Sequence, residues 1–182
     1  MIHIKDEKDI LNVFQKFTEG YKVRAVDHVD DFMEIFSPRA DVQMIGIGAT
    51  VPGAYEWFTG KDEIKEIILS DWTYWGNVHF DMQTLRLSQI ENVAWFSLCV
   101  TLEQVDSSED TWGFFLDQMK ELLEKDEQTN HDRIFEAAHF GIRRVREKNL
   151  GAGYPWRIVI TGTLVRDENW QFHTLHWSMP VD

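Results

Sequence analysis

The sequence predicts an α+β protein built on a curved antiparallel sheet that forms a pocket. Apolar residues recur at helical spacing over the first part of the chain, up to residue 75. Apolar and polar residues then alternate over long stretches, which tight polar turns connect. The chain has 182 residues, which suits one domain, 1–182, with a hydrophobic core that needs no disulfides.

Three helices are predicted before residue 76. Asp6 can cap the first helix and Gly20 marks its end, Pro38 ends the second, and Thr59 with Asp62 forms a capping box at the third. The apolar stripes are Ile10, Phe14, Phe17 and Tyr21 in the first helix, Val29, Phe32, Met33 and Phe36 in the second, and Ile64, Ile67, Ile68, Trp72 and Trp75 in the third.

Five segments read as strands, namely 40–48, 78–90, 92–105, 156–166 and 169–179. The short polar turns at 91–92 and 167–169 predict that their flanking strands pair as antiparallel hairpins. The single cysteine, Cys99, lies in an apolar run and is interpreted as a small buried hydrophobe.

The segment 106–153 interrupts the strands and predicts two helices that form an antiparallel hairpin. Asn130 can cap the second helix, whose basic end, 143–148, is expected to be solvated or to face the acidic first helix. The apolar stripes are Trp112, Phe115, Met119, Leu122 and Leu123, then Ile134, Phe135, Ala138, Ile142 and Val145.

The formal net charge of −13 argues against nucleic acid and against an anionic membrane as partners, because both require a basic surface. The first ten residues do not resemble a signal peptide, and no stretch is apolar enough to span a bilayer. A cytoplasmic location is therefore expected.

Two motifs carry a resemblance to the SnoaL-like proteins of the nuclear-transport-factor-2-like (NTF2-like) superfamily. They are WFTGKDEI at 57–64 and WQFHTLHWSMP at 170–180, and the second also resembles the closing strand of calmodulin-dependent kinase association domains. The resemblance covers about residues 5–105 and 154–182, through the order of the elements as much as through residue identity.

The resemblance implies a cystatin-like α+β cone: a cone-shaped barrel of a curved antiparallel sheet wrapped around helices, with a two-helix insertion between the central strands. Its members include isomerases, cyclases, dehydratases, epoxide hydrolases, hub domains and simple binders, and many are homodimers that pack sheet faces together. A homodimer is therefore expected here. The insertion 106–153 departs from the family pattern and would cover the pocket, extend the dimer interface, or both.

Asp71 is the most informative single residue. It follows Ile64 by seven positions and so shares the apolar stripe of the third helix, beside Trp72 and Trp75. A carboxyl group on an inward face is costly unless it is paired, and burial raises its pKa. Asp71 is either a pocket group that binds a ligand or acts as a base, or a structural acid that accepts a hydrogen bond.

The last two strands supply the remaining candidate ligand-binding residues. Strict alternation places Gln171, His173, Leu175, Trp177 and Met179 on one face of the last strand, and Trp170, Phe172, Thr174, His176 and Ser178 on the other. By hairpin pairing, Arg157 and Thr161 are expected on the His173 face. The association-domain resemblance implies that Trp177 and His173 point into the pocket, and that His176 lies at the dimer interface.

No cofactor or metal is predicted, because the histidine and acid spacings match no metal motif. The isomerases of the superfamily pair an aspartate base with a tyrosine donor. Tyr21 and Tyr74 are the tyrosines expected near the pocket, but neither is matched to that pair by a motif.

Three functions remain open. The first is binding of a small, partly apolar molecule by Asp71, Trp72, Trp75, Arg157, Thr161, His173 and Trp177. The second is a general acid–base enzyme with Asp71 as base and His173 as acid. The third is an interaction module that uses the inserted helices, which an exposed apolar stripe on them would favour.

Overall fold

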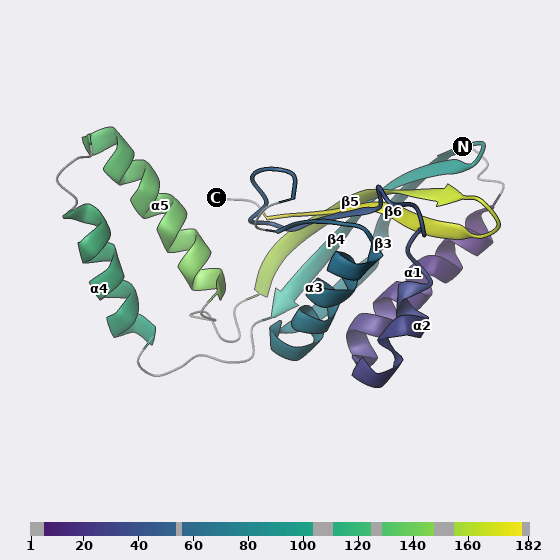
Figure 1. Ribbon diagram of the computed structural model, residues 1–182, viewed down its shortest axis with the longest axis horizontal. Helices are drawn as coiled ribbons and strands as arrows, with labels where there is room; N and C mark the ends of the chain where they lie inside the picture. Colours follow the sequence, from purple (N-terminus) through teal and green to yellow (C-terminus); the bar gives the residue numbers. More distant parts are fainter. Residues whose placement is uncertain (1–5, 54–55, 104–110, 125–128, 148–154, 180–182) are drawn as a thin grey trace. The chain divides into compact units, whose positions relative to one another are not determined.

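The computed structural model describes residues 6–53, 56–103, 111–124, 129–147 and 155–179. The chain forms two compact units, one of residues 1–102 with 156–180 and the other of residues 103–155 with 181–182. In the described residues, the first unit holds a sheet and three α-helices, and the second holds two α-helices (Figure 1).

The first unit is organised around a sheet of six strands, counted over the described residues, in the order β2-β1-β6-β5-β4-β3. The strands are β1 Gln43–Ile45, β2 Trp57–Thr59, β3 Asn77–Ile90, β4 Val93–Glu103, β5 Pro155–Arg166 and β6 Trp170–Ser178. The sheet is open, because β2 and β3 at its two edges do not pair. β1 runs antiparallel to β2 but parallel to β6, so this last pair departs from the predicted all-antiparallel sheet.

The four long strands predicted from alternation are confirmed. The segment 40–48 is a strand only over Gln43–Ile45, and β2 at Trp57–Thr59 was not predicted. Both strands are three residues long, which is too short for alternation to distinguish a strand from a loop.

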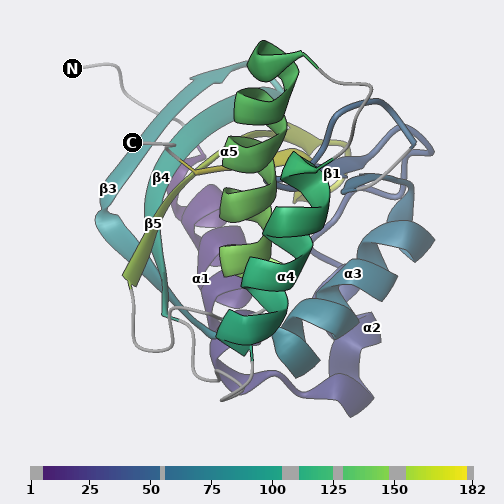
Figure 2. The same cartoon turned by 90° about the vertical axis from the view of Figure 1, so that its left-hand side faces the viewer.

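The helices of the first unit are α1 Glu7–Val23, α2 Val29–Met33 and α3 Lys61–Tyr74, with a 3-10 turn, η1, at Val26–His28. Figure 2 shows β3, β4 and β5 curving around α1, which confirms a curved sheet wrapped around helices. Phe14 on α1 packs edge-on against Phe96 of β4 and Phe172 of β6, with ring centroids 4.7 and 5.3 Å apart. The core thus lies between α1 and the concave face of the sheet.

The predicted end of the first helix is wrong. Gly20 lies inside α1, which continues to Val23 and ends at Arg24 in the left-handed conformation (φ 53°). A side chain at position 20 would overlap the ring of Phe32 on α2. Gly20 therefore allows α1 and α2 to approach closely, rather than ending α1.

Asp6 is the N-cap residue of α1, as predicted, but its side chain makes no capping bond. The predicted cap of α3 is wrong, because Gly60 rather than Thr59 precedes that helix. Glu63 accepts a hydrogen bond at 2.7 Å from the backbone N–H of Thr59, which lies one residue before the N-cap Gly60. Asp62 makes no such contact.

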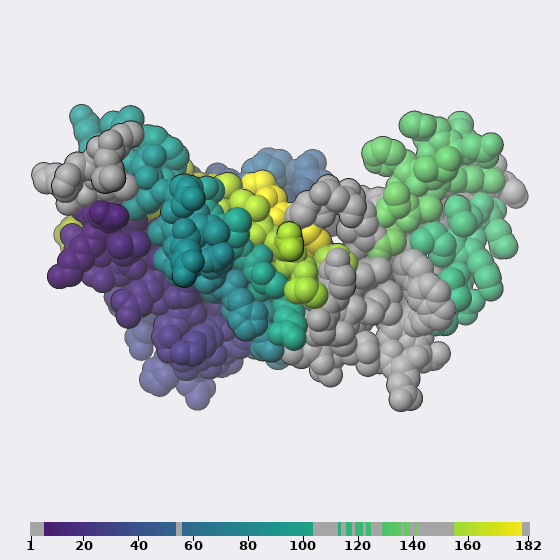
Figure 3. All heavy atoms as spheres, turned by 180° about the vertical axis from the view of Figure 1, so that it is seen from behind, coloured from purple at the N-terminus to yellow at the C-terminus, as the bar shows by residue number. Residues whose placement is uncertain are grey.

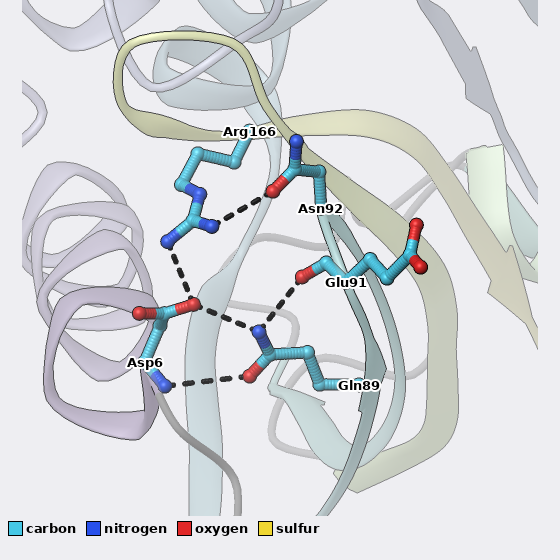
Figure 4. A network of polar contacts seen from close by, with 5 residues as sticks. All are labelled: Asp6, Gln89, Glu91, Asn92 and Arg166. Carbon is cyan, nitrogen blue, oxygen red and sulfur yellow. Dashed lines mark hydrogen bonds and ion pairs between the residues drawn. The ribbon is translucent and has the colours of Figure 1, made fainter.

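Asp6 instead belongs to a polar network that joins α1 to two hairpins (Figure 4). Its carboxylate accepts hydrogen bonds from Arg166 and Gln89, both at 2.8 Å. Arg166 also donates to the Asn92 side chain at 2.7 Å, and Gln89 donates to the Glu91 carbonyl at 2.9 Å. The network fixes the start of α1 against the β3–β4 turn and the end of β5.

The outer face of β4 carries exposed apolar residues, and the predicted burial of Cys99 is wrong. Cys99 is exposed, as are Val93 and Trp95 on the same face. The inward positions of β4 are Ala94, Phe96, Leu98, Val100 and Leu102, all buried. Cys99 lies out of phase with them, so its apolar neighbours in sequence do not enclose it. Atoms of β3 and β4 form much of the surface seen in Figure 3 (teal).

The second unit is a helical hairpin of α4 Thr111–Leu123 and α5 Asn130–Glu147, which pack against each other. The predicted cap at Asn130 is wrong by one residue. The Thr129 hydroxyl accepts from the Asp132 N–H, while Asp132 accepts from the Thr129 N–H and hydroxyl. Ile134 and Phe135 on α5 are 72% and 71% exposed.

Candidate functional site

Asp71 and Tyr21 form a hydrogen-bonded pair where α1 and α3 end. The Tyr21 hydroxyl donates to Asp71 Oδ2 at 2.9 Å, across 50 positions of sequence. Tyr21 is buried, whereas Asp71 as a residue is half-buried. Among the described residues, Tyr21 is the one hydrogen-bond donor to this carboxyl, so Oδ1 accepts no bond from them.

Burial raises the pKa of Asp71 to about 7. The hydrogen bond from Tyr21 and the nearby Arg24 guanidinium lower this pKa, and the nearby Glu56 carboxylate raises it. Burial is the largest of these effects, and it disfavours the charged carboxylate. Burial and the neighbouring Asp71 also hold the pKa of Tyr21 well above its usual value, so Tyr21 stays protonated and acts as a donor.

Arg24 fixes the ends of α1 and α3 against each other. Its guanidinium donates to the carbonyls of Tyr21 (3.0 Å), Trp75 (2.9 Å) and Gly76. All three nitrogens of the group are thus bonded to backbone oxygens. Arg24 therefore positions the pair and contributes positive charge, while each of its three nitrogens donates to a backbone carbonyl rather than to Asp71.

Aromatic rings surround the pair. Trp177 of β6 lies 5.8 Å from Tyr21 and 5.3 Å from Trp75, between ring centroids. Trp177 is 1% exposed, and its indole Nε1–H has no hydrogen-bond partner among the described residues. Trp72 is also buried, its Nε1–H is likewise unpaired within the described part of the chain, and it packs on Phe32 with centroids 5.0 Å apart. Asp71, Trp75 and Trp177 are therefore brought together, with Trp72 on the side of α2.

Glu56 approaches Asp71 from the loop before β2. Its Oε2 accepts from the Gly48 N–H at 2.7 Å, and its carbonyl accepts from the Gly46 N–H at 2.7 Å. These bonds close the loop between β1 and β2 onto itself. The loop thereby places a second carboxylate close enough to raise the pKa of Asp71.

A β-bulge in β6 changes the predicted faces of the last hairpin. Thr163 pairs with Thr174 and Leu164 pairs with Phe172, so His173 is left as the extra residue. The bulge shifts the alternation by one, and Trp170, Phe172, Leu175 and Trp177 are all buried. The expectation that His173 and Trp177 share a face fails for this reason.

Arg157 and Thr161 do not join Trp177 either. Ile160 is the residue paired with Trp177, and Thr161 pairs with His176, which is exposed. Thr161 thus belongs to the outward row of β5, and Arg157 is exposed in the same row. The predicted alignment of these two residues with Trp177 is wrong.

His173 lies apart from the Asp71–Tyr21 pair. Its Nε2 is 3.7 Å from the carboxylate of Asp41, and the residues that the structure describes offer no hydrogen-bond partner to its buried Nδ1. The expected pairing of Asp71 with His173 as base and acid is therefore replaced by Asp71 with Tyr21. Tyr74, the other tyrosine expected here, is 77% exposed.

Two groups of the site were missed at the sequence level, Arg24 and Glu56. Arg24 follows the last turn of α1 and acts through a left-handed backbone conformation that its residue type does not indicate. Glu56 lies in a loop whose path depends on the β1–β2 pairing. Neither position carries a sequence signal.

The described residues hold no group of three or more His, Cys, Asp or Glu side chains arranged for a metal ion. Over the same residues, every helix is too short or too polar to cross a membrane.

Solved structures of NTF2-like proteins are similar to this chain in fold. A ketosteroid isomerase-like protein from Erwinia carotovora atroseptica matches with a TM-score of 0.57 and 11% identity, over 97% of this chain and 98% of that one. An NTF2-like protein of unknown function from Pseudomonas putida matches with a TM-score of 0.57 and 12% identity, over 99% and 90%. A protein with a cystatin-like fold from Nostoc punctiforme, also of unknown function, matches with a TM-score of 0.56 and 8% identity, over 98% and 94%.

These similarities show the fold. The chain has the NTF2-like, cystatin-like fold that its two motifs predicted. No protein-family model matches the chain, and no curated protein matches its sequence. Its function must therefore be argued from its own residues, because one fold hosts many activities.

Proposed function

We propose that the chain binds a small, partly apolar molecule at the Asp71–Tyr21 pair. The observation that carries the proposal is a half-buried carboxyl with one unbonded oxygen, set among aromatic rings. A few polar groups within an apolar, aromatic lining is the usual composition of a ligand site. The similarity in fold to a ketosteroid isomerase-like protein supports such a use of the fold.

Thermal-shift screening of a metabolite library tests this proposal. A true ligand at about 100 times its Kd is expected to raise the Tm of the wild type by roughly 5 to 10 °C. The shift should disappear in Asp71→Asn and Trp75→Ala, and persist in Asp62→Asn, an exposed change on the same helix. Ligands that raise the Tm of the wild type and of all three variants equally would contradict binding at this pair.

Proton transfer at Asp71 is a second candidate function. A pKa of about 7 is the value that suits a general base or acid at neutral pH. A ¹³C NMR titration of the Asp71 carboxyl is expected to show a midpoint near 7 that moves little in Asp62→Asn. A midpoint near 4, the ordinary value for aspartate, would eliminate acid–base catalysis by this residue.

The interaction-module hypothesis and the homodimer both stay predictions. Exposed Ile134 and Phe135 on α5 favour the first, and the exposed Val93 and Trp95 on the outer face of β4 favour the second. Sedimentation equilibrium, which reports the mass in solution, decides whether a dimer forms.

A further inference from the structure

We propose that the ligand carries a protonated amine, which binds the free oxygen of Asp71 against the face of Trp75. The inference rests on the proposed function and specifies its ligand class. Hydrogen bonding, local charge and the surrounding rings each support it independently.

The hydrogen bonds of the pair leave room for one more donor. Asp71 Oδ2 accepts from Tyr21, and Oδ1 accepts nothing from the described residues. A carboxylate is acceptor-only and can accept several hydrogen bonds, so an N–H donor on a ligand completes its coordination. An ammonium is the stronger choice, because charge-assisted bonds are roughly twice as strong as neutral ones.

The charges around Asp71 also favour a cation. The charged or titratable groups that act on its carboxyl are Glu56 from the loop before β2, and Arg24 and Tyr21 from α1. Tyr21 remains neutral, so Arg24 is the one positive charge among the groups that act on the Asp71 carboxyl. Each nitrogen of the Arg24 guanidinium donates to a backbone carbonyl, and none donates to Asp71. A ligand cation would balance the charge of the ionised Asp71 carboxylate.

The aromatic rings at the pair are suited to an ammonium group. Trp75 and Trp177 lie 5.3 Å apart at an interplanar angle of 71°, and Trp75 remains half-buried rather than sealed. Cations are attracted to the negative face of an aromatic ring, most strongly that of tryptophan.

The net charge of −13 acts in the same direction over a longer range. A strongly negative protein attracts cationic ligands and repels anionic ones. An anionic ligand would have to overcome this field, and would also lie beside Asp71 and Glu56.

Binding of an amine should therefore depend on the ionisation of Asp71. The carboxylate binds a cation better than the neutral acid does, so affinity should rise as the pH passes through 7. A ligand that accepts a hydrogen bond from the neutral acid would show the opposite dependence. The pH profile of binding thus distinguishes the two ligand classes.

Three probes of equal size test the inference: benzylamine, which stays protonated at pH 6 and pH 8, benzyl alcohol and benzoate. Their Kd values are measured from the indole N–H signals of Trp75 and Trp177 in NMR titrations of the full chain. Benzylamine is expected to bind roughly tenfold more tightly at pH 8 than at pH 6, because the ionised fraction of Asp71 rises by that factor. The Kd of benzyl alcohol should change by less than about twofold between the two pH values, and benzoate should bind most weakly.

Two variants complete the test. Asp71→Asn should abolish the pH dependence of benzylamine binding and weaken it roughly tenfold at pH 8, while leaving benzyl alcohol unchanged. Asp62→Asn changes the net charge equally and should behave as wild type. If benzyl alcohol or benzoate binds more tightly than benzylamine, the amine inference is overturned and the proposed function stands. If no probe shifts either indole signal, the inference is also overturned, and the metabolite screen alone decides the proposed function.

Discussion

The Asp71→Asn variant is expected to gain stability relative to the wild type as the pH rises from 5 to 8. The pKa of Asp71 is about 7 in the folded chain, against an ordinary value of 3.8. The folded state therefore binds more protons than the unfolded state between these two values. By linkage, the stability contributed by Asp71 is fully present below pH 3.8 and is lost as the pH rises through 7. Asparagine does not titrate, so the variant lacks this loss.

The difference in free energy of unfolding between the variant and the wild type should change by about 2 to 3 kcal/mol from pH 5 to pH 8, in favour of the variant at pH 8. Urea unfolding at the two pH values measures it, and groups common to both proteins cancel in the comparison. Asparagine can still accept the Tyr21 hydrogen bond, so the pair is kept. Asp62→Asn should show a difference of less than about 0.5 kcal/mol between the two pH values. Parallel pH profiles for wild type and Asp71→Asn would show that Asp71 is an ordinary surface acid.

The placement of Asp71 was predictable because helical periodicity is a local property. Its position seven residues after Ile64 sets it on the apolar stripe of α3, and Ile64, Ile68 and Trp72 are indeed buried. The partner of Asp71 was not predictable from the same rule. Tyr21 lies on α1, and only the tertiary fold, which brings the ends of α1 and α3 together, sets the two side chains 2.9 Å apart.

The predicted faces of the candidate residues on the last hairpin were wrong for one physical reason. Period-two alternation assumes an uninterrupted strand, and a single bulge at His173 reverses the faces on one side of it. The family resemblance implied that Trp177 and His173 face the pocket, and the structure brings Trp177, but not His173, to the Asp71–Tyr21 pair. Arg157 and Thr161 were placed through alternation and lie on the outward row. A bulge of this kind has no reliable sequence signature when no glycine occupies it.

Gly162→Ala is expected to destabilise the first unit by roughly 3 kcal/mol, because no space exists for a methyl group. Gly162 pairs with Leu175 beside the bulge, between the inward residues Ile160 and Leu164. An added Cβ would overlap the Thr174 carbonyl oxygen and lie 2.9 Å from the ring of Phe96. The carbonyl belongs to the backbone of β6 and cannot rotate away as a side chain can.

Urea unfolding of Gly162→Ala and of Thr161→Ala, the neighbouring change, measures this effect. Thr161 belongs to the outward row and is half-buried, so its truncation should cost less than about 1 kcal/mol. The two variants thus compare an inward and an outward methyl-sized change on one strand. Equal stabilities would mean that β6 can move away from β5 at low cost. In that case the backbone of β6 would not hold Trp177 rigidly beside Tyr21, and the geometry of the Asp71 site would depend on the helices α1 and α3 alone.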